Sequence, residues 1–330
     1  MTTTPTATST DRFLHLGSSE GYFKRNELGA LSNQFYRGNG YIVLVDALNA
    51  SEVDGLQNET KRICLEEHAV LQRQEAGAST PELTEDEVLR QFLCIHHPQK
   101  ISQHVYDYLA HESVIEVLTD VIGANVKCMQ SMLFIKASGK PGQAWHQDEH
   151  FIPTRDRSLT GAWIALDAAV VENGCLWVIP GSHRPGVIWP MYPHEDPRYD
   201  CAQMAYDFPY DDDEAVPVEV PAGAAVIFNG YLLHKSEPNK LDGGYRRVLV
   251  NHYMSAESLL PWFHPKNLEV PVGHADFRDI VLVAGKDPYA WKGTEDIYKA
   301  MVRPSGEGGC GDGRVSLSEY RKQLLEKGAP

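Results

Sequence analysis

The stretch Trp145–Pro153 constrains this chain most, because it reads Trp-His-Gln-Asp-Glu-His-Phe-Ile-Pro. On an extended strand, His146 and Asp148 would place an imidazole and a carboxylate on the same face, about 6–7 Å apart. Two such groups form one edge of a metal site. A facial triad of two histidines and one carboxylate needs one more imidazole from elsewhere, and it leaves half of an iron ion's coordination sphere open.

A rival interpretation of the same letters is the inverted zinc-protease motif H-x-x-E-H, which His146, Glu149 and His150 match. That motif requires a helix, because only there do positions i and i+4 share a face. Gly142 lies just upstream and Pro153 follows soon after His150. The intervening aromatic residues also favour a strand, so we expect no protease helix here.

The candidate for the third ligand is His234, which ends the apolar run 224–233 and therefore belongs to a different strand from His146. His183 competes with it. His183 sits in a Pro-Gly-Ser turn, where a structural or supporting role is the expected one. On composition alone, a structural role is commoner than metal ligation for any such histidine.

Arg246 and Arg247 stand at the start of an otherwise apolar strand. Alternation along a strand sends one side chain inward and the other outward. An arginine that points into a β-barrel needs an anion, and the guanidinium fork suits a carboxylate. An oxygenase that uses 2-oxoglutarate needs such a group for the distal carboxylate of that cosubstrate.

Hydrophobic periodicity predicts a helical first third followed by strands. We expect helices at residues 26–37, 51–75, 85–92 and 112–121, and strands at 41–45, 132–135, 145 onward, 162–166, 175–179, 216–220, 224–228 and 247–253. Ser51 and Asp54 resemble a capping box. Glu172-Asn173-Gly174 reads as a turn, and the chain beyond Trp262 reads as irregular and helical. This pattern predicts an α+β protein whose core is a double-stranded β-helix of the jelly-roll or cupin kind, with flanking N-terminal helices.

Composition excludes several classes of protein. Hydrophobic residues make up 42% and charged residues 23% of the 330 residues, which is typical of globular proteins. The net charge of −15 argues against binding to nucleic acid or a membrane surface, and mildly against a coenzyme A thioester. No run of about 18 apolar residues is present. Six scattered cysteines without a CxxC pair predict reduced thiols and a cytoplasmic location.

The order of short segments resembles the phytanoyl-CoA dioxygenase-like family of Fe(II)- and 2-oxoglutarate-dependent oxygenases. The similarity covers about residues 120–255. The matching segments are Met132-Leu133 with Lys136, His146-Gln147-Asp148 with His150, Ala162-Trp163, Glu172-Asn173-Gly174-Cys175-Leu176 with Pro180-Gly181-Ser182-His183, His234-Lys235-Ser236 with Asn239, and Tyr245-Arg246-Arg247.

This resemblance implies the site residues one by one. The metal ligands, which are also the catalytic residues, are His146, Asp148 and His234. The contacts to 2-oxoglutarate are Arg246, Ser236, Trp163, Met132 and Gln147. An extra glycine before the arginine pair departs from the family pattern, so Arg247 remains a fallback for Arg246. His252 is expected to be a surface or supporting residue.

The resemblance also implies the reaction. We expect Fe(II), 2-oxoglutarate and O2 to hydroxylate an unactivated C–H bond of a small organic substrate, with 2-oxoglutarate decarboxylated to succinate and CO2. Halogenating relatives lack the carboxylate ligand, so Asp148 favours hydroxylation or a related oxidation. Two alternatives remain open: a non-catalytic jelly-roll binding protein, and a metal-dependent cupin that does not use 2-oxoglutarate. The oligomeric state, monomer or homodimer, stays undecided.

The expected domain organisation has three parts. Residues 1–20 form a flexible tail, residues 21–265 the oxygenase domain, and residues 266–330 a C-terminal extension packed on the core. Within the domain, about 21–123 is helical, about 125–255 is the β-core, and about 187–215 is an insertion over the mouth of the barrel. Loops of that length are usually functional. The aromatic residues of this insertion could line a ligand or simply pack the loop; they are Trp189, Tyr192, Tyr199, Tyr206 and Tyr210.

Overall fold

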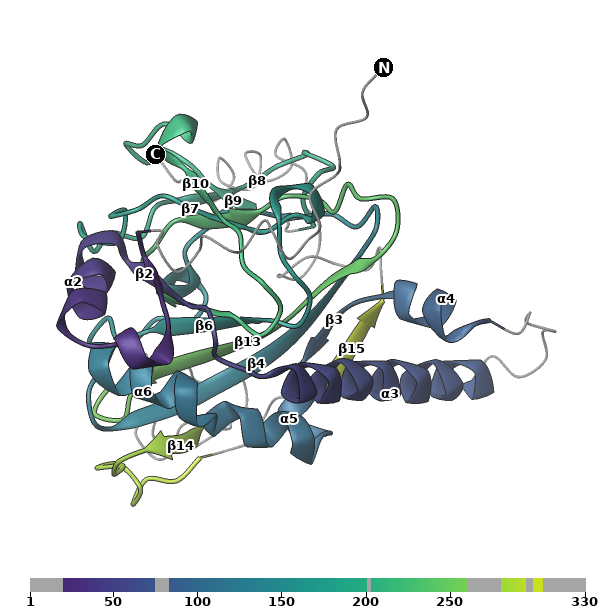
Figure 1. The fold of residues 1–330 in the computed structure, drawn as a ribbon, viewed down its shortest axis with the longest axis horizontal. Helices are drawn as coiled ribbons and strands as arrows, with labels where there is room; N and C mark the ends of the chain where they lie inside the picture. Colours follow the sequence, from purple (N-terminus) through teal and green to yellow (C-terminus); the bar gives the residue numbers. More distant parts are fainter. Residues whose placement is uncertain (1–19, 75–82, 201–202, 260–279, 295–298, 305–330) are drawn as a thin grey trace, which may run out of the picture.

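The computed structural model describes residues 20–74, 83–200, 203–259, 280–294 and 299–304. Two β-sheets face each other, and helices cover the outer side of the larger sheet (Figure 1). This arrangement confirms the expected α+β class with a double-stranded β-helix core. Among the described residues, no helix has both the length and the apolar character that a membrane crossing requires.

The large sheet has nine strands in the order β1-β2-β11-β6-β13-β4-β3-β15, with β14 pairing with β4. Its strands are β1 (Tyr22–Phe23), β2 (Tyr41–Leu44), β3 (Phe92–His96), β4 (Val126–Ala137), β6 (Thr160–Ala165), β11 (Ala225–Asn229), β13 (Tyr245–Ser255), β14 (Val281–Ala284) and β15 (Met301–Pro304). Only β1 and β2 pair in parallel; the other pairs are antiparallel.

The small sheet has four strands in the order β10-β7-β12-β5. They are β5 (Gln143–His146), β7 (Leu176–Val178), β10 (Val216–Val218) and β12 (His234–Ser236). A separate two-stranded ribbon consists of β8 (Met191–Pro193) and β9 (Gln203–Ala205). The small sheet and this ribbon lie on the side of the large sheet that faces away from α3 (Figure 1).

Alternation along the strands sorts the large sheet into two faces. Leu133 and Leu249 point outward, into the core that the sheet shares with the helices. Trp163, Val248 and Val250 point inward, into the core between the two sheets. A side chain of β13 therefore faces the interior of the β-helix when its residue number is even, at least from 246 to 252.

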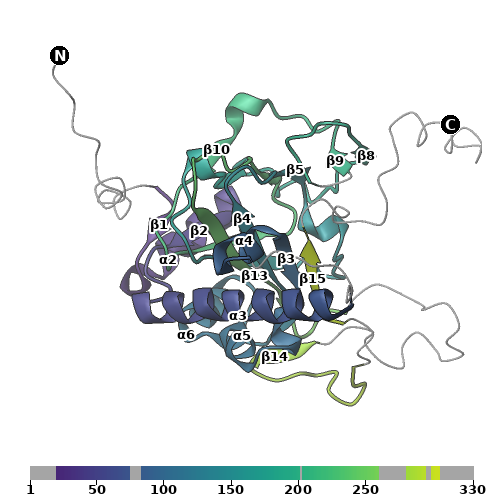
Figure 2. The same ribbon diagram turned by 90° about the vertical axis from the view of Figure 1, so that its right-hand side faces the viewer.

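Five helices are described: α2 (Ala30–Asn39), α3 (Ala50–Gln74), α4 (Glu85–Arg90), α5 (Gln103–Asp107) and α6 (Glu112–Val121). The long helix α3 runs across the whole width of the large sheet (Figure 2). In α6, Val114, Val117 and Leu118 are buried at the spacing of one helix face. The first third of the chain is therefore largely helical, as expected.

Local signals at helix ends were predicted less well. The N-terminus of α3 is capped by Asn49, whose side chain accepts from the backbone of Glu52 while the Glu52 carboxylate accepts from the backbone of Asn49. The proposed box of Ser51 and Asp54 was two residues too late. Residues 26–37 form a 3-10 turn, Arg25–Glu27, followed by α2 rather than one helix.

Two other expectations were wrong. The helix expected at 85–92 ends at Arg90, and Phe92–His96 is strand β3. The chain beyond Trp262, expected to be irregular and helical, forms strands β14 and β15 in the part that the structure describes. Both strands add to the large sheet, β14 beside β4 and β15 beside β3. Pairing with an existing sheet edge can turn short segments of weak propensity into strands.

Several aromatic side chains of the insertion pack against each other or against residues next to the insertion. Trp189 and Tyr210 contact a cluster around Trp145. The rings of Tyr192 and Tyr206 lie 5.8 Å apart across the β8–β9 ribbon. Tyr199 donates its hydroxyl hydrogen to Glu237 at 3.1 Å. Of the two interpretations, packing of the insertion accounts for these contacts.

The turn at Glu172-Asn173-Gly174 is confirmed as a 3-10 turn that ends at Gly174 in the left-handed region, with φ +78°. It does not join paired strands, since β6 lies in the large sheet and β7 in the small one. A Cβ at Gly174 would lie 2.0 Å from the backbone oxygen of Glu237. Gly139 has the same φ of +78° but open space around it.

We expect Gly174→Ala to lower the free energy of unfolding by about 3 kcal/mol, because left-handed strain and a backbone clash add. Gly139→Ala should cost only about 1 kcal/mol, since it brings the strain alone. Urea unfolding of both variants measures the difference. Equal losses would mean that the backbone near Glu237 gives way without cost.

Candidate metal centre

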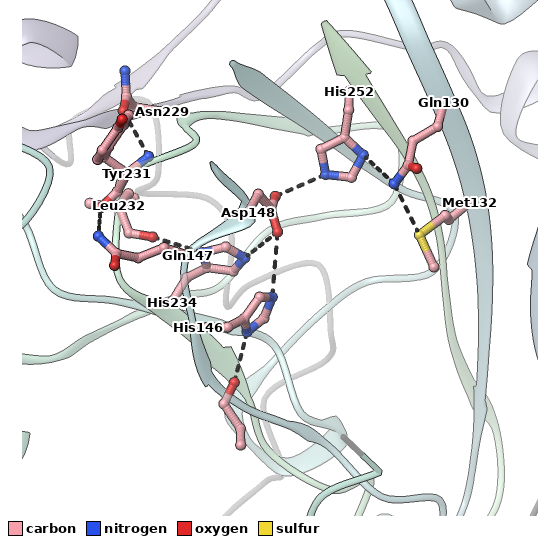
Figure 3. A network of polar contacts seen from close by, with 11 residues as sticks. Gln130, Met132, His146, Gln147, Asp148, Asn229, Tyr231, Leu232, His234 and His252 are labelled. Carbon is pink, nitrogen blue, oxygen red and sulfur yellow. Dashed lines mark hydrogen bonds and ion pairs between the residues drawn. The ribbon is translucent and has the colours of Figure 1, made fainter. Parts of the chain in front are cut away.

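The side chains of His146, Asp148 and His234 meet between the two sheets (Figure 3). One potential ligand atom from each lies within 4.8 Å of the others, and all three residues are buried. His146 ends β5 and His234 begins β12, and the antiparallel pairing of these strands places the two residues opposite each other. Within the described residues, this is the group of metal-ligand side chains that the structure brings together.

The backbone at this site departs from the expected continuous strand. Gln147 is extended, with φ −126° and ψ 127°, but Asp148 begins a short 3-10 helix, Asp148–His150. The one extended residue keeps His146 and Asp148 on the same side. No α-helix spans His146 and His150, so the geometry of the zinc-protease motif is not formed.

Both imidazoles are oriented by the backbone. The Nδ1 atom of His146 lies 2.7 Å from the carbonyl oxygen of Ala144, and that of His234 lies 2.9 Å from the carbonyl oxygen of Leu232. Because a carbonyl only accepts, Nδ1 carries the proton in each ring. The lone pair on each Nε2 is then free to bind a metal, which is the second-sphere arrangement typical of metal-binding histidines.

The two carboxylate oxygens of Asp148 have different neighbours. Its Oδ1 atom lies 3.5 Å from Nε2 of His146 and 3.6 Å from Nε2 of His234. Its Oδ2 atom accepts a hydrogen bond from Nε2 of His252 at 2.8 Å. The Nδ1 atom of His252 in turn accepts from the amide of Gln130 at 3.3 Å, which fixes the His252 tautomer (Figure 3).

The protonation states suit a cation. Burial, reinforced by the neighbouring His234, lowers the pKa of His146 to about 4. Burial alone would raise the pKa of Asp148, but His234 and His252 hold it well below its usual value. At neutral pH the site therefore offers a neutral His146 imidazole and an ionised carboxylate. Two imidazole nitrogens and one carboxylate oxygen on one face fit iron(II), with the opposite face left open.

The two adjacent arginines go to opposite faces of β13. Arg247 points outward, where its guanidinium binds both oxygens of Asp167 at 2.7 and 2.8 Å. Arg246 points inward and is 2% exposed. Its Nε has no hydrogen-bond partner among the described residues, and the guanidinium carbon lies 5.4 Å from the ring centre of Trp163. Burial lowers the pKa of Arg246 to about 10, so it stays charged at neutral pH.

Ser236 lies on the same strand as His234 and contacts Lys136, the neighbour of Arg246 in the large sheet. It lies two residues beyond His234 on β12, about 7 Å along the strand and on the same face. Its hydroxyl accepts from the ammonium group of Lys136 at 3.0 Å. Lys136 is the partner of Arg246 in the register of β4 and β13, so the two cations share the inner face. The family resemblance includes Lys136 but implies no role for it.

Met132 and Trp163 both lie on the inner face of the large sheet, and their contact with a cosubstrate stays a prediction. Met132 shares the inner face of β4 with Lys136 and accepts a weak contact from the Gln130 amide at 3.6 Å. Trp163 is on the inner face of β6, 5% exposed.

Gln147 and His183 have local partners. The Gln147 amide donates to the carbonyls of Val187 and Tyr231 and accepts from the backbone of Trp189. Its contact with a cosubstrate therefore stays a prediction. His183 lies 3.1 Å from the carbonyl oxygen of Arg37, outside the ligand group.

His252 is the functional residue that sequence reasoning left undecided. It is 5% exposed and binds Asp148 directly. His252 and Arg246 are an even number of residues apart on β13, so alternation sends both side chains to the same face of the sheet. This was the one sequence signal that could have placed His252 in the interior. Nothing in the sequence pointed to Asp148 as its partner.

Comparison with known proteins identifies the family that the sequence matches. The family model described as phytanoyl-CoA dioxygenase matches residues 36–248, about two thirds of the chain. Phytanoyl-CoA dioxygenase 1 of Oryza sativa subsp. japonica is 29% identical over 260 residues, which cover 69% of this chain and 91% of that protein.

Solved structures share the fold. The non-heme monooxygenase ThoJ in its apo form has a TM-score of 0.58 at 19% identity, over 89% of this chain and 97% of that chain. The epimerase SnoN from nogalamycin biosynthesis, solved with Fe3+, alpha ketoglutarate and a nogalamycin compound, has a TM-score of 0.52 at 19% identity, over 72% of this chain and 91% of that chain.

We expect His234→Gln to weaken binding of a divalent metal by at least about 100-fold, because one of three ligands is lost. His183→Gln should bind as the wild type does, since His183 lies outside the ligand group. Titration of the apoprotein with Co(II), followed by its visible absorption, measures both. Loss of Co(II) binding in the His183 variant would mean that His183, rather than His234, is the third ligand.

His252→Leu should weaken Co(II) binding by about 10- to 100-fold, because Asp148 loses the donor that orients it. His150→Leu is the matched control, since His150 is close in sequence to the ligands but outside the group. Calorimetry under the same conditions measures both affinities. An unchanged affinity in His252→Leu would mean that Asp148 is oriented by the metal alone.

Proposed function

Because the chain belongs to the phytanoyl-CoA dioxygenase family of iron- and 2-oxoglutarate-dependent oxygenases, we propose that it hydroxylates an unactivated C–H bond of a small organic substrate. The proposed reaction converts 2-oxoglutarate to succinate and CO2. One observation carries the proposal: Arg246, a buried guanidinium with no carboxylate partner among the described residues, lies on the inner face of the large sheet, between the sheets where the facial triad meets.

In this proposal, His146, Asp148 and His234 hold iron(II) through Nε2, Oδ1 and Nε2. When bound there, the iron would supply the oxidation of the C–H bond by O2, driven by decarboxylation of 2-oxoglutarate. The protein orients the reactants. His252 keeps Oδ2 of Asp148 engaged, so the aspartate offers one oxygen to the metal and the open positions stay free.

The cosubstrate would span from the metal to Arg246. Its distal carboxylate would bind the guanidinium of Arg246, next to the hydroxyl of Ser236. Trp163 would pack against the same guanidinium, as it already does without a ligand. Arg247 is unsuited to this role because Asp167 already occupies its donors.

Hydroxylation is favoured over halogenation because the carboxylate ligand is present. Oδ1 of Asp148 fills the position that a halide would need, and Oδ2 is held by His252. The outcome for the substrate, including desaturation, is decided by where its C–H bond lies. The position of that bond depends on the residues that bind the substrate.

Apolar side chains support an organic substrate with an apolar part. Phe151, Val187 and Ile188 are 40%, 43% and 37% exposed. The ring of Phe151 lies 6.2 Å from the ring of His146, and the carbonyl of Val187 accepts from Gln147. Exposed apolar groups next to a catalytic centre are typical of a ligand entrance.

The remaining predictions stay part of the proposal. We propose one oxygenase domain at 21–265 with a C-terminal extension on it, because β14 and β15 complete the large sheet. A cytoplasmic location is supported by four buried cysteine thiols among the described residues: Cys64, Cys94, Cys128 and Cys175. The net charge of −15 supports a small-molecule partner rather than nucleic acid.

The test is succinate formation by the purified protein, measured with extracts as a source of substrate and with mass spectrometry for a product heavier by one oxygen atom. Wild type should need both Fe(II) and 2-oxoglutarate. Arg246→Met should raise the KM for 2-oxoglutarate about 100-fold, because a charge-assisted bond worth about 3 kcal/mol is lost.

Arg247→Met is the matched control. It removes a neighbouring arginine and its ion pair with Asp167, so it should lower stability and leave the KM for 2-oxoglutarate near the wild-type value. Two results count against the proposal. Absence of succinate across a broad substrate range would favour a non-catalytic protein, and an unchanged KM in Arg246→Met would remove the anchor.

A further inference from the structure

One cavity, lined in part by residues of β4, β5 and β13, brings together buried charges from four parts of the chain. Arg246 of β13 and Lys136 of β4 line it together with Arg303 of β15 and Asp200 of the insertion. Leu93, Phe134, Pro141, Gly142 and Gln143 complete its wall. This cavity contains the guanidinium that the proposed function assigns to the distal carboxylate of 2-oxoglutarate.

All four charged residues of the cavity are more than nine-tenths buried. Arg246 is 2%, Lys136 4%, Arg303 5% and Asp200 6% exposed. Three positive charges therefore face one negative charge in a region shielded from water. Charges act on one another much more strongly there than at the surface. A carboxylate that enters the cavity experiences all four.

Arg303 and Asp200 form a buried ion pair, with Nη2 and Oδ2 2.5 Å apart. Arg303 reaches the cavity because β15 pairs with β3. The register sets Arg303 beside Cys94, and Cys94 beside Phe134, whose side chain packs into the core between the sheets. The C-terminal part of the chain thus delivers a cation to the inner face of the sheet.

Asp200 is held at the cavity by the backbone. Its N–H donates to the carbonyl of Gly142 at 2.9 Å, and the N–H of Gly142 donates to the carbonyl of Arg198 at 2.8 Å. Gly142 lies directly before β5, the strand that carries His146. The insertion therefore places a carboxylate beside the pocket, where it would repel an anion unless a cation offset it.

We propose that Arg303 and Asp200 set the electrostatic potential of the cosubstrate pocket, so that the C-terminal strand β15 is part of the site for the distal carboxylate. The inference rests on the proposed function. Arg303 attracts the carboxylate and cancels the repulsion of Asp200. Arg303 is a positioning residue, because it acts on binding through the field of the pocket rather than on the reacting atoms.

The charge of each partner predicts effects of opposite sign on 2-oxoglutarate binding. Arg303→Met leaves the carboxylate of Asp200 uncompensated and should raise the Kd about tenfold. Asp200→Asn removes the repulsion, leaves Arg303 charged and should lower the Kd several-fold. The neutral double variant should return close to the wild-type Kd. Calorimetry with Mn(II)-loaded protein measures all four without turnover.

A purely structural ion pair predicts a different result. Both single variants break the same contact, so both would weaken binding, and the double variant would stay weak. That pattern would overturn the proposal, as would an unchanged Kd in Arg303→Met. The five-carbon acid 2-oxopentanoate, which lacks the distal carboxylate, should bind wild type and Arg303→Met alike.

Lys127→Met is the matched control for damage to the C-terminal part. Lys127 is 2% exposed and binds Asp287 at 2.8 Å, so it also ties this part to β4, but at the opposite end of that strand from Lys136. It should lower stability and leave the Kd unchanged. A shift equal to that of Arg303→Met would show that loosening the extension, rather than charge, weakens binding.

The proposed function and this inference fail in distinguishable ways. If Mn(II)-loaded wild type does not bind 2-oxoglutarate, the proposed function is wrong. If wild type binds it and Arg246→Met does not, while Arg303→Met equals wild type, the proposed function stands and the inference is wrong.

Discussion

The antiparallel pairing of β12 with β5 is the constraint on which the site depends. It sets His234 directly opposite His146, although a long insertion separates the two in sequence. Each strand is short, and β12 also pairs with β7, so its register is fixed from both sides. A shift by one residue would turn the imidazole of His234 to the other face of the sheet. Backbone hydrogen bonds thus position the imidazoles before any metal binds.

The second constraint is alternation along β13. Arg246, Val248, Val250 and His252 face the interior, and Arg247 faces out. One strand therefore supplies both the group proposed to bind the cosubstrate and the imidazole that orients Asp148. Its neighbour β4 adds Lys136 and Gln130 by the same rule. Two adjacent strands of the large sheet thus line the pocket and orient Asp148, while β5 and β12 of the small sheet carry the two histidines.

Much of this could be predicted from the sequence. The spacing of His146 and Asp148 and the apolar run before His234 predicted the three side chains that the structure brings together. Alternation predicted that one of Arg246 and Arg247 points inward. Only the structure shows that the other, Arg247, forms an ion pair with Asp167. A local pattern cannot show which distant carboxylate a side chain meets.

The failures have a common physical origin. Residues 92–96 and 301–304 are strands because each pairs with a sheet edge that distant residues build. Asp148 begins a 3-10 turn, although its neighbours favour a strand, and there its carboxylate accepts from His252. The capping box of α3 is formed by Asn49 and Glu52, two residues before the expected pair Ser51 and Asp54, because several polar residues compete for that position.

The buried cations of the β-core differ in how they are compensated, and this difference separates structure from binding. Arg247 has Asp167, Arg303 has Asp200, and Lys136 donates to the oxygens of Ser236 and Glu237.

Arg246 contacts the ring of Trp163, and its Nε has no acceptor in the part of the chain that the structure describes. An uncompensated buried charge costs several kcal/mol, so Arg246 lowers the stability of the free protein. An anion that binds Arg246 recovers that loss as binding free energy. Among the buried arginines that the structure describes, Arg246 is the one without an acidic partner, so this position favours ligand binding over the stability of the free protein.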